Sequence, residues 1–387
     1  MTAKIAFWIS VSWVGYVYVG YPAGLWLLGS IRRRRFACSE DSLPTVSVLV
    51  SARNEEKDIG WKVRDTLNCD YPPEKIEMLV ASDASDDGTD DVLRSIADPR
   101  FRFVQNPRRM GKNLTLNRLT EMATGEVLFF TDANSHIPAD CFRKMTAHFA
   151  DPKVGCVTGW ERAEEEGADP GMSAGGGAYL GYEATINSLE SALGSVLVCD
   201  GSVFCMRKSL FAPVQPDLAN DLELPLRIGA QGYAVLYEPQ AYSTEKNTSS
   251  PSEEFNRRRR ICGQGILGFW RLRQQLTGLR AWQFISRKLM RWLATIPMTV
   301  ALITSATLAS NRFFLVLFIL QACFYIAALL GWFLVSVMKK SSRLLALPFY
   351  FMLVNLSAVT GIVEACLGRR FAVWEIPTLS RGREETQ

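Results

Sequence analysis

Residues 76–89 read IEMLVASDASDDGT, an apolar run that passes directly into an acidic loop. Such a short run with turn residues behind it is typical of a strand buried on both faces of a parallel sheet. Residues 127–134, VLFFTDAN, show the same arrangement. Because open α/β sheets bind ligands beyond the carboxyl ends of their strands, both acidic loops are predicted to lie at one binding edge.

The region around these loops alternates short apolar runs with longer amphipathic ones, from Thr45 to about Pro239. This alternation predicts repeated βα units and therefore an α/β fold. The expected strands cover residues 46–50, 76–81 and 101–104 and a run ending at residue 130; the expected helices cover residues 59–67 and 111–123.

Nearly uncharged segments flank the α/β region. Residues 5–31 are long enough to cross a bilayer and end at four arginines, 32–35, which predicts an uncleaved anchor over residues 1–35. The basic block places the following domain in the cytoplasm. Apolar stretches at residues 293–310, 313–338 and 344–367 predict about three further membrane helices within residues 293–368. We expect a multi-pass protein of the inner (plasma) membrane.

The side of the membrane that holds the C-terminus stays open. One anchor plus three spans would place the tail, residues 369–387, outside, whereas Arg369, Arg370, Arg381 and Arg383 favour the inside. Either one segment does not span, or the tail is an exception to the charge bias.

Composition limits the partners. The net charge is only +4, and basic residues gather near the apolar segments, which favours contact with anionic membrane lipids over nucleic acid. The nine cysteines form no CxxC pair, as expected of reduced thiols in the cytoplasm. Nothing indicates the oligomeric state.

Asp83 lies two residues after the end of the strand predicted at residues 76–81. A carboxylate there can accept hydrogen bonds from a uracil edge or from ribose hydroxyls. The neighbouring Asp86 and Asp87 are predicted instead to shape the turn and cap the next helix. A calcium-binding loop is excluded, because Arg94 stands where its bidentate glutamate is required.

Asp132 and Asn134 offer two oxygen ligands on the same side of an extended chain. Together they could hold Mg²⁺ or Mn²⁺ while the cation bridges a diphosphate. A plain turn after a strand is the alternative. The second acidic strand end, at Asp83, favours the functional interpretation.

Asp221 begins another apolar-periodic run. It is either a helix N-cap or a general base that removes a proton from an attacking hydroxyl. Lys112, at a predicted helix start, could meet a phosphate or remain solvated. Within the four arginines at 257–260, either the whole block is a cytoplasmic flank of the membrane segments, or one or two side chains clamp a diphosphate. Residues 266–292, with tryptophans among basic residues, predict an amphipathic segment at the interface.

The ordered set of motifs resembles glycosyltransferase family 2 in its membrane-integrated bacterial form. The matching pieces lie between residues 44 and 265 and read VLVSARNE (48–55), SDASDDGT (82–89), GKNL (111–114), TDAN (131–134), DGS (200–202), ND (220–221) and YEP (237–239). The resemblance implies a GT-A (Rossmann-like) fold, a nucleotide-sugar donor expected to be UDP-linked, a divalent cation and inversion at the anomeric carbon.

The resemblance also implies roles for individual residues. Asp83 would contact the nucleoside, in a pocket lined by Ala52 and Glu55. Asp132 would bind the metal and diphosphate, and Asp221 would be the base. Asp200 and Gly201 would lie on the acceptor side.

Two departures from the family pattern bear on the reaction. Cellulose, chitin and hyaluronan synthases carry Gln-x-x-Arg-Trp before the membrane helices; here only Arg260 matches, and Ile261 cannot stack on a sugar as tryptophan does. Asn134 stands where many members have aspartate. We therefore expect addition of sugar to a lipid-linked or growing cell-envelope glycan. The alternatives are a processive synthase that exports its polymer and a non-catalytic nucleotide-sugar binder; the joint presence of the three aspartates argues against the binder.

Overall fold

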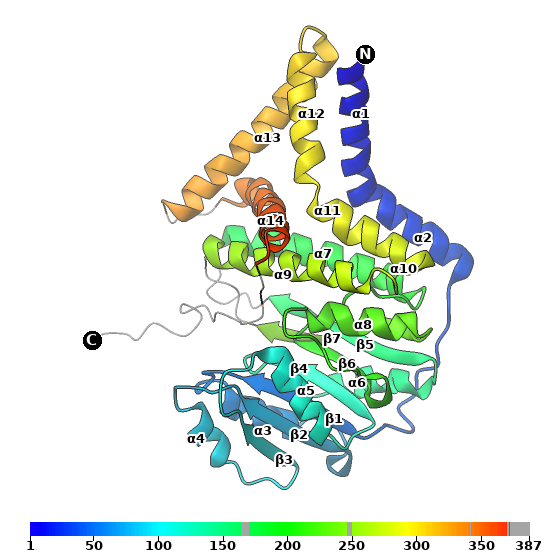
Figure 1. Ribbon diagram of the computed structural model, residues 1–387, viewed down its shortest axis with the longest axis vertical. Coiled ribbons are helices and arrows are strands. Elements are labelled where there is room, and N and C mark those ends of the chain that lie inside the picture. The colour runs from blue at the N-terminus through cyan, green and yellow to red at the C-terminus, as the bar shows by residue number, and fades with distance from the viewer. Residues whose placement is uncertain (164–169, 246–249, 339, 341, 370, 372–387) are drawn as a thin grey trace.

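The computed structural model describes residues 1–163, 170–245, 250–338, 340, 342–369 and 371. Its centre is a seven-stranded mixed sheet in the order β3-β2-β1-β4-β6-β5-β7 (Figure 1). The strands are β1 (Val46–Ala52), β2 (Ile76–Ser82), β3 (Phe101–Gln105), β4 (Val127–Thr131), β5 (Val154–Ala163), β6 (Val203–Arg207) and β7 (Ala234–Glu245).

The strands that carry the acidic loops are parallel neighbours. β1 pairs in parallel with both β2 and β4, so the chain order reverses across β1. Ala52 lies opposite Ser82, which brings the ends of β1 and β2 together. β6 then runs antiparallel to β4 and β5, an arrangement that repeated βα units do not predict. The four expected strands are thus confirmed as β1 to β4, all paired in parallel, whereas the repeated βα units expected as far as Pro239 do not extend to β6.

Helices cover both faces of this sheet. Side chains alternate along β1, so Val48 and Val50 pack with α3, α4 and α6 on one face, while Leu49 packs with α5 and α8 on the other. The helices are α3 (Ile59–Leu67), α4 (Thr89–Arg94), α5 (Lys112–Met122), α6 (Cys141–Thr146) and α8 (Asn220–Ala230), with short 3₁₀ turns η2 (Pro73–Lys75), η3 (Ala147–Ala150) and η4 (Lys208–Leu210). The helices predicted at residues 59–67 and 111–123 are confirmed.

A helical layer separates the sheet from the projecting apolar helices (Figure 1). Helices α7 and α9 lie between the sheet and α14, and α1 packs beside α12 at the far end. These elements are α1 (Thr2–Gly15), the π-helical turn η1 (Tyr16–Gly20), α2 (Tyr21–Arg32), α7 (Pro170–Ser191), α9 (Pro251–Leu272), α10 (Gly278–Phe284), the π-helical turn η5 (Ile285–Leu289), α11 (Met290–Trp292), α12 (Thr295–Thr307), α13 (Arg312–Ser336) and α14 (Arg343–Cys366).

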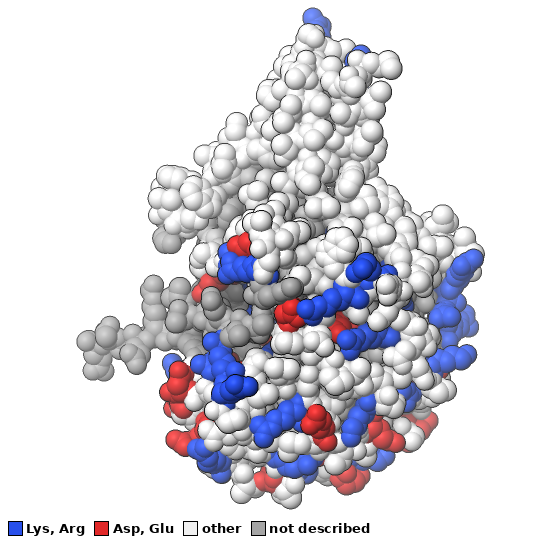
Figure 2. Space-filling view, viewed as in Figure 1, with Lys and Arg blue, Asp and Glu red and all other residues white. Residues whose placement is uncertain are grey.

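Two helices in the described part of the chain are long and apolar enough to cross a membrane: residues 312–336 and 344–366. A third span results if residues 278–292 and 295–307, bent by 55° at their break, are counted as one. Figure 2 shows that the projecting helices present almost no charge, whereas charged residues gather over the α/β body. This distribution suits helices surrounded by lipid.

The predicted N-terminal anchor does not form one straight helix. It folds as α1 and α2 joined by the π-helical turn η1, and it is not among the helices that qualify as spans. The span expected at residues 293–310 is also shorter, since α12 has 13 residues and qualifies only together with the segment before it. The anchor stays a prediction. Most of the C-terminal tail, including Arg370, Arg381 and Arg383, lies outside the described residues.

Candidate active site

Asp83 lies just beyond the carboxyl end of β2 and is only 3% exposed. Its Oδ1 accepts hydrogen bonds from the Met110 amide at 2.7 Å and from Asn106 Nδ2 at 3.1 Å, and its Oδ2 accepts one from the Gly111 amide at 2.8 Å. Gly111 has φ +88°, which a side chain would strain. Asp83 therefore shapes the loop that delivers Lys112, and its contact with a nucleoside stays a prediction.

The loop after β1 is tied to the loop after β2. The Ala52 carbonyl accepts a hydrogen bond from the Asp83 amide at 2.8 Å, and the Glu55 amide donates to Thr89 Oγ1 at 2.7 Å. Arg53, which the sequence motifs did not single out, donates to the carbonyl of Asp83 at 2.8 Å. The structure thus brings Ala52, Glu55 and Asp83 together at one edge of the sheet, and their role in a nucleoside pocket stays a prediction.

Asp86 and Asp87 have the local roles that we expected. Asp87 accepts hydrogen bonds from the Thr89 amide at 3.0 Å and from the Thr89 hydroxyl at 2.5 Å, next to the start of α4. Asp86 is exposed and lies 3.9 Å from Arg53. Both carboxylates therefore make contacts within these two loops.

Asp132 is reached directly after β4 and forms an ion pair with Lys112, the first residue of α5. Its side chain is 21% exposed, so it is open to a ligand. The chain does not continue extended as we predicted. Residues 133–134 form a turn, in which the Ser135 hydroxyl donates to the Asp132 carbonyl at 2.9 Å. The turn satisfies backbone groups that the end of the strand leaves without a partner, and it leaves Asn134 exposed.

The donor set at this turn suits a hard divalent cation that is shared with a substrate. Among the described residues, no three His, Cys, Asp or Glu side chains lie close enough to enclose a metal ion by themselves. Mg²⁺ is commonly held by one or two carboxylates together with substrate phosphates. Asp132, with Asn134 two residues away, fits that arrangement, because phosphate oxygens would supply the remaining ligands.

Asp221 is the second residue of α8. The N-cap of α8 is Ala219, and no side chain caps this end, which excludes the alternative that Asp221 is a helix N-cap; its role as a base stays a prediction. Burial raises the pKa of the Asp221 carboxyl, although the positive charges of Lys112 and Arg260 oppose this effect. No described side chain hydrogen-bonds to the carboxylate. It is therefore an unengaged and comparatively basic group.

Gly201 lies directly against Asp221. A Cβ built on Gly201 would sit 3.6 Å from Asp221 Oδ2, so the absence of a side chain keeps the approach to this carboxylate open. The adjacent Asp200 accepts hydrogen bonds from the Glu161 amide at 2.8 Å and from the Ser202 hydroxyl at 2.6 Å. Burial, reinforced by the Glu161 carboxylate, raises the pKa of Asp200 to about 6.

The four consecutive arginines of α9 point to different surroundings, and three of them pair with three different glutamates. Arg258 pairs with Glu254 at 2.7 Å, and Arg259 pairs with Glu364 of α14 at 3.3 Å. Arg257 pairs with Glu161 on β5 at 2.6 Å. Burial and the neighbouring Arg257 lower the pKa of Arg260 to about 10, and the carboxylates of Asp221 and Asp132 oppose that shift.

Three positions separate Arg257 from Arg260, so both lie on the helix face toward the sheet. The whole block is thus not a simple cytoplasmic flank. Arg260 lies within electrostatic reach of the two central aspartates. Glu161, which sequence reasoning missed, was detectable as an acidic residue after the apolar run of β5.

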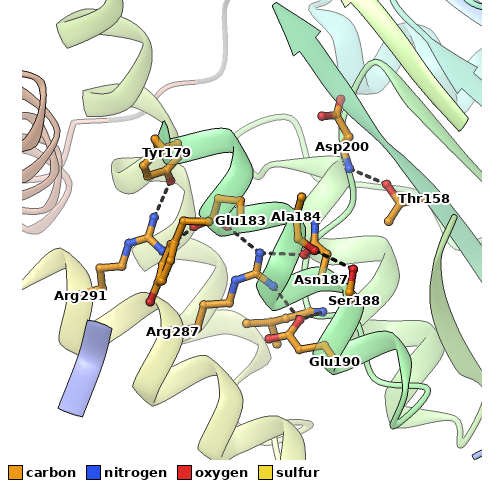
Figure 3. A network of polar contacts seen from close by, with 12 residues as sticks. Thr158, Tyr179, Glu183, Ala184, Asn187, Ser188, Glu190, Asp200, Arg287 and Arg291 are labelled. Carbon is orange, nitrogen blue, oxygen red and sulfur yellow. Dashed lines mark hydrogen bonds and ion pairs between the residues drawn. The ribbon is translucent and has the colours of Figure 1, made fainter. Parts of the chain in front are cut away.

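The interface segment is fixed to α7 by buried ion pairs (Figure 3). Arg287, 3% exposed, donates to Glu190 and Glu183, each at 2.6 Å, and to Asn187 at 2.8 Å. Arg291 donates to the Tyr179 hydroxyl at 2.6 Å. Removing one partner from such a network leaves an uncompensated buried charge, which is strongly destabilising. The segment predicted to be amphipathic is therefore packed into the folded protein against α7.

Taken together, the sheet order, the acidic strand ends and the helical layer define a GT-A fold of the nucleotide-diphospho-sugar transferase type. The profile described as "Glycosyltransferase like family 2" matches residues 44–263. The chain belongs to this family.

The chain spans about half the length of the curated relatives that it matches. The chain is 24% identical over 239 residues to the beta-monoglucosyldiacylglycerol synthase of Synechocystis sp., covering 59% of this chain and 50% of that protein. It is 26% identical over 219 residues to an N-acetylglucosaminyltransferase of Rhizobium meliloti, covering 51% and 50%. Both matches agree with the family assignment.

A solved structure extends the similarity in fold to nearly the whole chain. The mannosyltransferase PcManGT from Pyrobaculum calidifontis, described in complex with GDP-Man and Mn²⁺, superposes with a TM-score of 0.71 at 19% identity. The match covers 93% of this chain and 99% of that one. It therefore includes helices outside the α/β domain.

Proposed function

We propose that this protein is an inverting glycosyltransferase that moves a sugar from a nucleoside-diphosphate donor to a lipid-linked or growing cell-envelope glycan at the membrane. The observation that supports this most directly is the proximity of Asp132, Asp221 and Arg260 beside the carboxyl edge of the sheet, where Asp132 and Arg260 both act on the Asp221 carboxyl and both aspartates act on Arg260. Open α/β sheets bind ligands at this edge, where the strand order reverses.

The donor diphosphate would lie between Lys112 and Arg260, whose positive charges balance the phosphates. Asp132 and Asn134 would hold a divalent cation, Mg²⁺ or Mn²⁺, and the bound cation would neutralise charge on the departing diphosphate. The loops that join Ala52, Glu55 and Asp83 would receive the nucleoside, expected to be uridine. Glycosyl transfer then depends on how these residues hold the donor's leaving group.

Asp221 would act at the opposite side of the sugar. Its carboxylate takes the proton of the acceptor hydroxyl while the hydroxyl oxygen attacks the anomeric carbon. The bond from that carbon to the diphosphate breaks, and the pair of bonding electrons leaves with the nucleoside diphosphate. Attack from the side opposite the leaving group inverts the configuration. A raised pKa suits this role, because a more basic carboxylate accepts the proton more readily.

The acceptor would approach from the apolar helices, past Asp200 and Gly201. Relatives named as a glycolipid synthase and as an N-acetylglucosaminyltransferase support a lipid or glycan acceptor. We favour single addition over processive synthesis, because Ile261 stands where an aromatic residue would stack on an acceptor sugar. The catalytic domain would face the cytoplasm of a multi-pass inner-membrane protein.

The test is donor turnover by the purified full chain in detergent, with Mn²⁺ or Mg²⁺ and a panel of UDP- and GDP-linked sugars. Release of nucleoside diphosphate with at least one donor is expected. Product length then separates the two modes, since products longer by one sugar would exclude processive synthesis. Binding of donors without any turnover, across lipid-linked acceptors as well, would refute the enzymatic proposal and favour the non-catalytic binder.

A further inference from the structure

Lys62, in the middle of α3, is only 1% exposed, although lysine is among the residues least often fully buried. Its ammonium donates hydrogen bonds to the Ser135 carbonyl at 2.6 Å, to Thr131 Oγ1 at 2.8 Å and to Ser135 Oγ at 3.2 Å. An ammonium has three protons to donate, so this set accounts for all of them.

All of these acceptors belong to the two residues that enclose the Asp132 turn. Thr131 is the last residue of β4, and Ser135 closes the turn through its hydroxyl bond to the Asp132 carbonyl. The hydroxyls of Thr131 and Ser135 also lie 3.0 Å apart. The ammonium thus joins the beginning and the end of the segment that carries Asp132 and Asn134.

None of the three hydrogen-bond acceptors is a carboxylate, so the charges of Asp132 and Glu245 act on the ammonium without a direct contact. Filling the space beneath the turn would need no charge, since an apolar side chain of similar volume would do so without the cost of burying an ammonium. What an ammonium adds is direction, because it holds two hydroxyls and a carbonyl at fixed positions. Residues around metal ligands often have this effect, and changing them typically lowers metal affinity about 10–100-fold.

We propose that Lys62 is a positioning residue for the metal and diphosphate loop, holding the turn at residues 132–134 so that the Asp132 carboxylate stays directed toward Lys112 and the donor. This proposal rests on the proposed function, since it assumes that Asp132 receives a cation with its phosphates. Lys62 itself touches neither donor nor acceptor. It acts from beneath the turn through Thr131 and Ser135.

The test compares Lys62→Met with the parent by titrating Mn²⁺ into the full-length protein in the presence of UDP and, in parallel, of GDP. Binding is measured by calorimetry or by the Mn²⁺ paramagnetic resonance signal. Methionine keeps the length of the side chain and removes the charge and the donors. Lys75→Met is the matched control, because Lys75 donates to the Leu43 carbonyl at 2.9 Å, away from the turn. We expect Lys62→Met to weaken Mn²⁺ binding by about tenfold or more, and Lys75→Met to leave it within twofold.

Variants of the acceptor residues provide the control for a possible folding defect of Lys62→Met. Thr131→Val and Ser135→Ala each remove one acceptor and leave the lysine in place, so they carry the test if Lys62→Met does not fold. Each should weaken Mn²⁺ binding, and each should add little to the effect of Lys62→Met where that variant folds, because they remove one shared interaction. A purely structural lysine would lower the melting temperature and leave the Mn²⁺ affinity of the folded protein unchanged.

The outcomes separate this proposal from the proposed function. If the parent binds Mn²⁺ with neither UDP nor GDP, the proposed donor site is wrong. If the parent binds Mn²⁺ and folded Lys62→Met binds it within twofold as tightly, only the role of Lys62 is refuted. Where Lys62→Met does not fold, the same conclusion follows if both Thr131→Val and Ser135→Ala bind Mn²⁺ within twofold of the parent.

Discussion

Replacing Asp221 by asparagine should nearly abolish turnover without weakening the fold. The substitution keeps the size and shape of the side chain and removes its ability to accept a proton. General bases contribute roughly 10²–10⁴-fold to rate, and burial raises the pKa of the Asp221 carboxyl, which makes its carboxylate a better proton acceptor. At ~1.4 kcal/mol for each factor of ten, the transition state would lose about 3–5 kcal/mol.

The expected effect on stability is small and follows from the same environment. Asp221 caps no amide of α8, so asparagine removes no capping hydrogen bond. Loss of the negative charge near the helix start costs about 0.3–1 kcal/mol. The raised pKa shows that the folded protein disfavours the ionised form, and removing that charge offsets the loss. We expect the melting temperature to shift by no more than about 3 °C.

The assay is release of nucleoside diphosphate at saturating donor, alongside thermal unfolding of the same preparations. Glu223→Gln is the matched control, since Glu223 lies in the same turn of α8 but pairs with Arg227. That variant should keep its turnover. Two results would refute the reasoning: Asp221→Asn within threefold of the parent, or equal losses in both variants.

Three further results are expected. Lys112→Met should raise the KM for the donor by about tenfold, because it removes a charged contact to phosphate. Binding of Mn²⁺ without nucleotide should stay unchanged or become tighter, because Lys112 and the cation share the Asp132 carboxylate. Weaker metal binding would contradict the assignment. Arg260→Ala should raise the donor KM at least about tenfold, whereas Arg259→Ala should mainly lower the melting temperature, and steady-state kinetics with thermal unfolding distinguish the two. Turnover should fall as the pH drops through the raised pKa of Asp221, since the base works only when ionised. The acidic limb of the pH profile of kcat should therefore lie above the ordinary carboxyl pKa of ~3.9. The residual activity of Asp221→Asn should lack this limb.

The central strands β1, β2 and β4 were predictable because they are buried on both faces. Such strands read as uninterrupted apolar runs, and the acidic residues that follow them mark where each run ends. The second half was not predictable in the same way. Whether β6 runs parallel or antiparallel to β4 depends on the path of the connecting chain, and that path leaves little trace in local composition.

The candidate site was predictable in its aspartates but not in their setting. Asp83, Asp132 and Asp221 follow recognisable patterns, yet the turn at residues 132–134 depends on Ser135 and on Lys62, which lies about seventy residues earlier in the chain. A lysine within an amphipathic helix ordinarily indicates a solvent-facing position. Its burial depends on which groups the folded sheet places beneath it, and this is a tertiary property.

Helix α9 shows why the donor site and the membrane helices cannot be treated as separate units. The predicted catalytic domain ends at residue 265, but α9 continues to Leu272, so that boundary falls within a helix. Arg257 and Arg260 face the sheet, while Arg259 pairs with α14. A Cβ on Gly361 of α14 would lie 2.0 Å from the Arg259 carbonyl oxygen, so the two helices touch through their backbones. Helix α14 therefore packs directly on the backbone of the helix that also carries Arg260.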